Sequence, residues 1–421
     1  MTHNPASRFF PGARLFTRRS RVGLFTRRPR PRFLAALCAC ALLSAAVLLP
    51  APREVARAKG HAEMAWEVLA PVSYKNLTVF PLRGGDAATD AYITLDEGTR
   101  NGTVVIAERG AAQTATRRAR GAANRQVQQA VSYNEGASVN ELALVNKSGK
   151  KLLLLAGEVV VGGQQDRIVQ EDRIIPPVSV PVALSVFCVE HGRWTARTTS
   201  YGGGGGASNG GGSGGGRMVG GVSPERAPSQ GAPDDGLSGA KFKSLGAVAH
   251  PRLRAAAQDQ KEQGAVWNEV SANNQKLGTS NSTDTYQEVY SNRQVAATLD
   301  DYVRALQHEV LRPGVVGVVV ARNGKPVWAD IFAGSRLFAA YWPKLLKSYA
   351  VDALGDNTSD ARPTVEQARA YLATLNGTVS TTTQEGVYQL VKTEQPTYAV
   401  FELRDISLAN PLRLHFNKMD R

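Results

Sequence analysis

Polar side chains interrupt one apolar segment of this chain, and their types suit the binding of a phosphorylated sugar. Glu158 stands within the apolar run 152–161, where an unpaired carboxylate would be costly to bury. The glycine pair 162–163 allows a close backbone approach to a ligand, and Gln165 and Arg167 supply an amide and a planar guanidinium. Two interpretations stay open: a ligand site, or a solvent-exposed hairpin turn with an ordinary salt bridge.

A second group of reactive side chains lies in the segment 188–194. A strand here would place the Cys188 thiol and the Glu190 carboxylate on one face, because side chains alternate along a strand. The thiol and the His191 imidazole suit a nucleophile with its base, although a single cysteine is more often a small buried hydrophobic residue. The candidate catalytic residues are Glu158, Glu190 and Cys188, and the candidate ligand-binding residues are Gln165, Arg167, Arg193 and Trp194.

The placement of cysteine and histidine argues against a disulfide framework and against a metal site. Only Cys188 lies beyond residue 40, so it has no partner for an internal disulfide there, and the fold depends on its core. The histidines after residue 60 are scattered and have no metal-ligand spacing: His61, His191, His250, His308 and His415. We therefore predict no metal and no cofactor.

The elements that must position these groups are mostly strands in the first half of the chain. Short apolar runs with β-branched residues predict strands at 77–82 and 103–107. Thr94 and Glu97 form a capping box, which predicts a short helix between those strands. The segment 139–155 has two apolar runs around a turn and predicts a hairpin.

The second half changes to helices around a hairpin. Apolar residues fall on one helical face in 295–310 and again in 337–349. Between them, 315–332 predicts a hairpin, because its central Asn-Gly pair suits a type I′ turn, and 378–404 returns to strands. The fold class is therefore α+β, with mainly antiparallel strands first and amphipathic helices packed around a hairpin and further strands second.

One tract divides these halves by composition. Thirteen glycines lie between Tyr201 and Gly221, and a Pro-rich polar stretch continues to residue 240. Such a sequence buries too little apolar surface to offset its ordering entropy, so 201–240 is predicted to be a flexible insertion. We expect 59–200 and 241–421 to be two halves of one composite domain, and a linker between two domains is the alternative.

The first 58 residues have the order of an export signal. An arginine-rich stretch leads into the apolar run 33–49, and the small-residue site 56–58 follows. The run is borderline for a membrane span of about 20 residues, so cleavage is favoured over an uncleaved inner-membrane anchor. We therefore expect a periplasmic or extracellular protein whose membrane contact is limited to this segment.

The net charge of +14 does not indicate a nucleic-acid partner. Residues 1–59 hold twelve Lys and Arg against one acid, a net +11, and the remaining residues carry the difference, +3. A nucleic-acid-binding domain needs a basic surface in its folded part. A small polar ligand is a possible partner, no nucleic acid is expected, and protein partners stay open.

Several segments form a pattern together: 139–142, 154–158, 165–167, 188–190 with 193–194, 264–267, 315–320 and 342–346 with 348–349. They resemble a bacterial family, the ARG (ADP-ribosylglycohydrolase) and rhodanese-phosphatase-superfamily-associated domain family, which has no assigned function. The resemblance covers roughly 70–350 and spans the glycine tract, which implies one domain with an inserted loop. It also implies a role near ADP-ribose or related phosphorylated compounds, although it carries no residue roles.

Two functions follow from these observations. The first is an exported domain that binds or processes an ADP-ribose-like or other ribose-phosphate ligand, in which carboxylates hold hydroxyls or act as a base and arginines hold phosphate. The second is a non-enzymatic envelope or interaction protein, because no recognised catalytic pattern accompanies the export signal. The sequence leaves open whether the protein is an enzyme.

Overall fold

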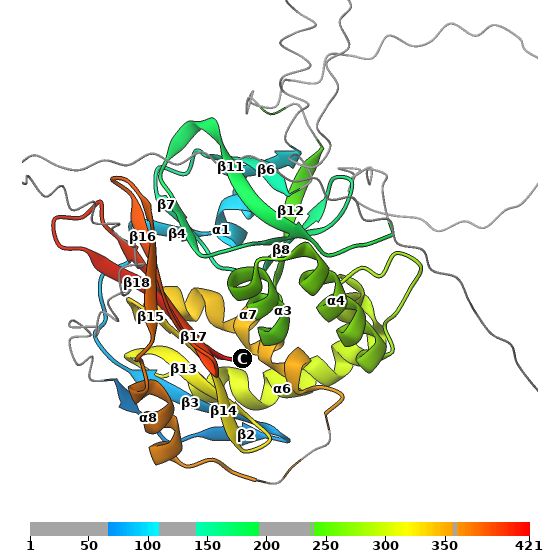
Figure 1. Ribbon diagram of the computed structural model, residues 1–421, viewed down its shortest axis with the longest axis vertical. Coiled ribbons are helices and arrows are strands. Elements are labelled where there is room, and N and C mark those ends of the chain that lie inside the picture. The colour runs from blue at the N-terminus through cyan, green and yellow to red at the C-terminus, as the bar shows by residue number, and fades with distance from the viewer. Residues whose placement is uncertain (1–65, 109–139, 193–236, 238–239, 357–358, 360) are drawn as a thin grey trace, which may run out of the picture. The chain divides into compact units, whose positions relative to one another are not determined.

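The structure, a computed structural model, describes residues 66–108, 140–192, 237, 240–356, 359 and 361–421 (Figure 1). These residues form antiparallel sheets and helices, which confirms the predicted α+β class. The predicted export signal 1–58 and nearly all of the glycine-rich insertion 201–240 lie outside the described residues. Within the described ranges, no helix has the length and apolar character that a membrane crossing requires.

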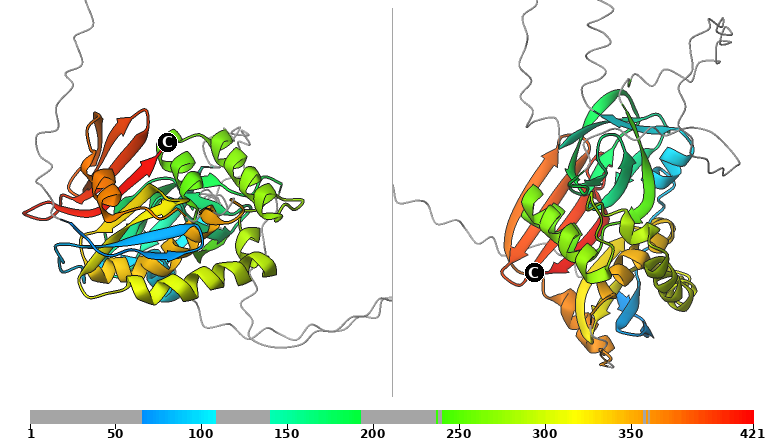
Figure 2. Two further views of the ribbon diagram at one scale, coloured as in Figure 1. Left: turned by 90° about the horizontal axis from the view of Figure 1, so that it is seen from below. Right: turned by 90° about the vertical axis from the view of Figure 1, so that its right-hand side faces the viewer.

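Nine strands form one antiparallel sheet in the order β1-β3-β13-β14-β18-β17-β16-β15, and β2 also pairs with β3. The predicted hairpin is confirmed as β13–β14, and its turn residues Asn323 and Gly324 have positive φ values of 50° and 81°, as a type I′ turn requires. Figure 2 shows the hairpin β15–β16, in orange, at one edge of this sheet. The strands are β1 (Glu67–Val68), β2 (Val72–Tyr74), β3 (Leu77–Arg83), β13 (Val315–Arg322), β14 (Lys325–Phe332), β15 (Thr378–Gln384), β16 (Tyr388–Gln395), β17 (Tyr398–Asp405) and β18 (Leu412–Asp420).

Six strands close into an antiparallel barrel in the order β11-β6-β5-β12-β8-β9. The last strand, β12, contains a bulge: the pairing passes from Ser244 with Val160 to Val248 with Glu158, so 245–247 oppose a single residue of β8. The barrel therefore joins strands from both sides of the glycine-rich tract. The strands are β5 (Val104–Glu108), β6 (Glu141–Asn146), β8 (Glu158–Gly162), β9 (Arg167–Val169), β11 (Val178–Cys188) and β12 (Lys241–Val248).

A third sheet of three strands has the order β10-β7-β4 and contains a parallel pair, β4–β7. Its strands are β4 (Tyr92–Thr94), β7 (Lys151–Leu154) and β10 (Arg173–Ile175). The hairpin predicted for 139–155 is wrong, because β6 pairs inside the barrel and β7 pairs in this sheet. Helix α1 (Leu95–Arg100) follows β4 directly and begins with the predicted capping box of Thr94 and Glu97.

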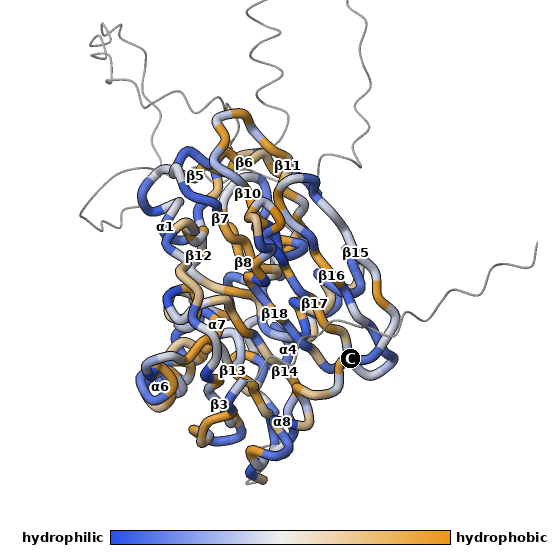
Figure 3. Tube along the Cα trace, turned by 90° about the vertical axis from the view of Figure 1, so that its left-hand side faces the viewer, coloured by the Kyte–Doolittle hydropathy of each residue, from blue (hydrophilic) through white to orange (hydrophobic). Residues whose placement is uncertain are grey.

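Helix α7 (Ser335–Ala353) contacts both the barrel strand β12 and the sheet strand β13 (Figure 1). Helix α6 (Arg293–Val310) packs beside it through the predicted apolar stripe, and Figure 3 shows hydrophilic and hydrophobic residues on different sides of α6. The Asn292 side chain caps α6 by accepting from the backbone N–H groups of Gln294 and Val295. The remaining helices are α3 (Pro251–Ala255), the π-helix η1 (Ala256–Gln260), α4 (Gln263–Leu277), α5 (Glu288–Ser291) and α8 (Val365–Ala373).

Apolar side chains fill both faces of the nine-stranded sheet. Along β13, Val318 and Val320 join the core under α6 and α7, whereas Val319 and Ala321 join the core that α8 covers. A strand buried on both faces reads as a continuous apolar run, as β13 does. A separate cluster, to which Ile106, Leu144 and Val160 belong, fills the barrel.

Candidate functional site

Glu158, the first candidate residue, is buried at the start of β8. Its side chain is 1% exposed, so the interpretation of this position as a solvent-exposed turn is wrong. A turn does precede it, and Gly157 adopts a φ of +82° there. The backbone N–H of Leu155 donates to the Glu158 carboxylate at 2.9 Å, so the turn holds the side chain inward.

The partner of Glu158 is Lys344 on α7. Its Nζ lies 2.5 Å from Glu158 Oε1 and 2.9 Å from Asp96 Oδ2, and Ser244 of β12 donates to the other Asp96 oxygen. Burial opposes the charge on Lys344, but the two carboxylates outweigh it and raise the Lys344 pKa. Burial alone would likewise raise the pKa of Asp96, and Lys344 lowers it instead. Burial raises the pKa of Glu158, and Lys344 opposes that shift. The three side chains form a buried polar link between the barrel, α1 and α7.

Gln165, Arg167 and Glu190 lie close together, and each is 2% exposed or less. Gln165 Nε2 donates to the backbone oxygen of Glu190 at 2.8 Å, and Arg167 Nη1 donates to Gln165 Oε1 at 3.3 Å. The backbone N–H of Asp166 donates to the Glu190 carboxylate at 3.2 Å. These contacts fix β9 against the end of β11, so a ligand would have to break them to bind here.

The other two candidate ligand-binding residues, Arg193 and Trp194, lie outside the described residues. Their neighbour His191 is described, and its ring meets the Trp267 ring edge-on with centroids 4.6 Å apart. The structure gives no hydrogen bond between His191 and Cys188 within the described part of the chain.

The Cys188 thiol is fully buried at the end of β11. Gln263 of α4 makes two hydrogen bonds to the Cys188 backbone. Its Oε1 accepts from Cys188 N–H at 2.9 Å, and its Nε2 donates to Cys188 O at 2.8 Å. Burial raises the pKa of the thiol, although the Arg167 guanidinium opposes that shift. A nucleophilic cysteine needs the opposite, a lowered pKa and access to solvent.

We expect Cys188 to resist thiol reagents in the folded protein. Labelling should be at least roughly tenfold slower before denaturation than after it, because the reagent reaches the thiol only when the structure opens. The measurement is native labelling followed by peptide mapping, which separates Cys188 from Cys38 and Cys40. Rapid labelling of Cys188 in the native state would revive the thiol-enzyme hypothesis.

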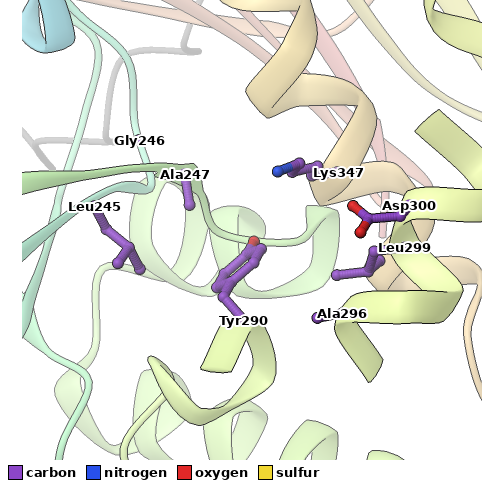
Figure 4. Close-up of a pocket in the computed structure, with 8 residues that line it drawn as sticks. All are labelled: Leu245, Gly246, Ala247, Tyr290, Ala296, Leu299, Asp300 and Lys347. Atoms are coloured by element: carbon purple, nitrogen blue, oxygen red, sulfur yellow. The ribbon is translucent and has the colours of Figure 1, made fainter. Parts of the chain in front are cut away.

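A pocket of about 120 Å³ lies between β12, α5, α6 and α7 (Figure 4). Figure 4 shows Lys347 and Asp300 on one side, Leu245 on the other, and the Tyr290 ring between them. The β12 bulge builds one wall, since the bulged residues 245–247 all line the pocket. Bulges commonly redirect side chains beside functional sites.

The two charged residues of this pocket differ from the buried candidates. Neither the Lys347 amine nor the Asp300 carboxylate makes a hydrogen bond or an ion pair with any described residue, and Lys347 is half-buried. Lys344 lies one helical turn before Lys347, so α7 supplies both the buried ion pair and the pocket cation. Our sequence prediction missed Lys347. The only available signal was a lysine within the apolar stripe 337–349.

A second buried polar network centres on Asp330 of β14. Arg254 donates to both carboxylate oxygens at 2.8 and 3.0 Å, and His415 Nε2 lies 3.1 Å from Oδ1. Trp328, Tyr349 and Asn417 also donate to this carboxylate. The other His415 nitrogen lies 2.5 Å from Asp172, so two carboxylates face one arginine and one histidine. All four of these charged side chains are fully buried, and the network joins α3, β14, β18 and the segment before β10.

Comparison with known protein families finds a match over most of the chain. The family model of the ARG and Rhodanese-Phosphatase-superfamily-associated Protein domain matches residues 65–210 and 236–405. This confirms the resemblance predicted from the sequence and extends it past residue 350. No curated protein and no solved structure matches the chain.

Proposed function

Since this chain belongs to the ARG and Rhodanese-Phosphatase-superfamily-associated Protein domain family, we propose that it binds a small ligand of the ribose-phosphate class. The site that we propose is the pocket of Lys347, Asp300 and Tyr290, and not the buried side chains of Glu158, Gln165, Arg167 and Glu190. The observation that carries this proposal is the pair of oppositely charged side chains that line one pocket without partners among the described residues. Lys347 is half-buried, and a half-buried charge usually has a partner, so its amine is available to a ligand. Asp300 is exposed at the rim of the same pocket and can join it.

The chemistry of the lining selects the ligand class. The Lys347 amine can donate to a phosphate or carboxylate, and Asp300 can accept hydrogen bonds from sugar hydroxyls. The Tyr290 ring offers a flat apolar face, while its hydroxyl is occupied by the backbone oxygen of Val248 at 3.0 Å. A volume of about 120 Å³ suits a sugar-phosphate head group and is below the ~300 Å³ of typical drug-sized sites, so the rest of a larger ligand would lie outside.

The role that we propose is binding, because Lys347 supplies a cation and Asp300 a hydrogen-bond acceptor to one pocket. The place of action that we propose is outside the cytoplasm, as residues 1–58 predict. The N-terminal residue of the protein recovered from separated cell fractions tests this. A protein found in the cytoplasm with residues 1–58 intact would contradict export.

Thermal unfolding in the presence of ribose 5-phosphate, ADP-ribose, ribose and inorganic phosphate tests the binding. A ligand at 100 times its dissociation constant should stabilise the protein by about 2.7 kcal/mol. Lys347→Met should remove about 1.5–3 kcal/mol of binding free energy for the phosphorylated ligands, because it removes a charge-assisted hydrogen bond. Asp300→Asn should weaken binding of the sugar-containing ligands more than that of phosphate.

The matched control is Lys150→Met, which removes an exposed lysine amine outside the pocket. It should leave ligand binding unchanged. A shift that survives Lys347→Met would place the ligand elsewhere and contradict this site. The absence of any shift across the four ligands would favour the second function predicted from the sequence, a non-enzymatic envelope or interaction protein.

A further inference from the structure

The nine-stranded sheet ends in a long strand that pairs on one side only. β15 has seven residues, all of them exposed, and its one partner among the described strands is β16. The row of backbone N–H and C=O groups along its outer side is therefore available to another strand. Val379 within it is one of the few large apolar side chains that the described residues expose, at 40%.

The other sheet edges of the described structure are short. On the far side of the same sheet, β1 has two residues and β2 has three. The edges of the small sheet, β4 and β10, have three residues each, and the barrel closes on itself without an edge. Short edges and closure are devices that prevent strand pairing between molecules, so β15 stands apart from every other edge.

β15 also lacks the remaining protective devices. Its sequence, Thr-Val-Ser-Thr-Thr-Thr-Gln, contains no charged residue and no proline. All seven residues pair in unbroken register with β16, so no bulge bends the strand away from a partner. Its β-branched residues also favour extended structure.

We infer that β15 is an association surface on which β15 of a second copy of this chain pairs antiparallel, about a two-fold axis at Thr381. In that register Thr381 faces its own counterpart and Val379 faces Thr383 of the second copy, so β-branched residues meet in these pairs. A neutral strand meets its copy without repulsion. A specific foreign peptide would need side-chain pockets beside the strand, and the pocket of Lys347 includes no β15 residue.

Analytical ultracentrifugation of the protein as purified tests this inference. The wild type should show a concentration-dependent dimer. Thr381→Lys and Thr381→Glu should each raise the dimer dissociation constant by roughly tenfold or more, because the axis places two like charges opposite each other. Position 381 is exposed, so both variants should keep the melting temperature of the wild type.

A mixture of the two variants tests whether the dimer forms across β15. Lys and Glu then face each other across the axis, and the mixture should recover a dimer that neither variant forms alone. A wild type that stays monomeric at all concentrations overturns the inference, as would be found if another segment of the same chain covered β15. A dimer that both substitutions leave intact, or separate variants that do not recombine, also overturns it.

Discussion

Replacing Asp330 with asparagine is expected to lower the free energy of unfolding by about 3–5 kcal/mol, which is a large part of the stability of a typical protein. The substitution keeps the shape of the side chain but removes the charge that Arg254 and His415 share. Arg254 is fully buried and would be left as an uncompensated charge. Burial alone would raise the pKa of Asp330, whereas these two cations hold it well below its usual range. Urea unfolding followed by circular dichroism gives the free energy.

The matched control is Asp301→Asn, which makes the same chemical change in an exposed ion pair with Arg304. It should alter the free energy of unfolding by no more than about 0.5 kcal/mol. Arg254→Met in the Asp330→Asn background should recover part of the loss, because the unpaired buried charge is then gone. Equal stability of Asp330→Asn and the wild type would contradict the central role of this carboxylate.

Where structure depends on neighbours in the sequence, prediction succeeded. The capping box of Thr94 and Glu97 is an interaction across three residues, and it starts α1 as predicted. The Asn323–Gly324 turn needs two residues that tolerate positive φ, which the sequence displays directly. The apolar stripe of α6 likewise becomes its buried face.

Strand pairing was less predictable, because it depends on distant segments. The two runs in 139–155 were predicted to pair with each other, and they became strands of different sheets. The Asn146 side chain donates to the backbone oxygens of Lys150 and Ile175, so this turn is tied to a segment 29 residues away. No local pattern distinguishes a turn that returns a strand to its neighbour from one that passes it to another sheet.

The candidate residues show the same limit. The sequence indicated that Gln165, Arg167 and Glu190 could act together, and the fold does bring them together. It did not indicate that they would be buried, because burial follows from packing of the whole barrel. The lysine that pairs with Glu158 is 186 residues away, within the predicted helix 337–349. A pairing at that separation becomes visible only in three dimensions.

The second large effect is a loss of stability with rising pH, which we expect from His415. Burial alone would lower the pKa of this imidazole, but Asp172 and Asp330 on its two nitrogens raise it from 6.5 to about 9. Between pH 6.5 and pH 9 the His415 imidazole keeps its proton in the folded protein and has lost it in the unfolded chain. The stabilisation from this proton is therefore complete below pH 6.5 and decreases until it is lost near pH 9. The slope is about 1.4 kcal/mol per pH unit, or roughly 3 kcal/mol across the full window.

The clean interval for this measurement is pH 6.5 to 8. Burial lowers the pKa of Lys418 from 10.5 to about 8. Above pH 8 the Lys418 amine therefore loses its proton in the folded protein but keeps it in the unfolded chain. The free energy of unfolding then rises with pH through Lys418, which opposes the effect of His415. Urea unfolding gives the free energy of unfolding of the wild type and of His415→Gln at several pH values. The difference between the two proteins cancels the pH effects that they share. The variant should be the less stable protein at pH 6.5, and the difference should shrink by about 2 kcal/mol by pH 8. Parallel pH profiles would show that His415 is neutral in the fold, and the buried network would then carry an unbalanced negative charge.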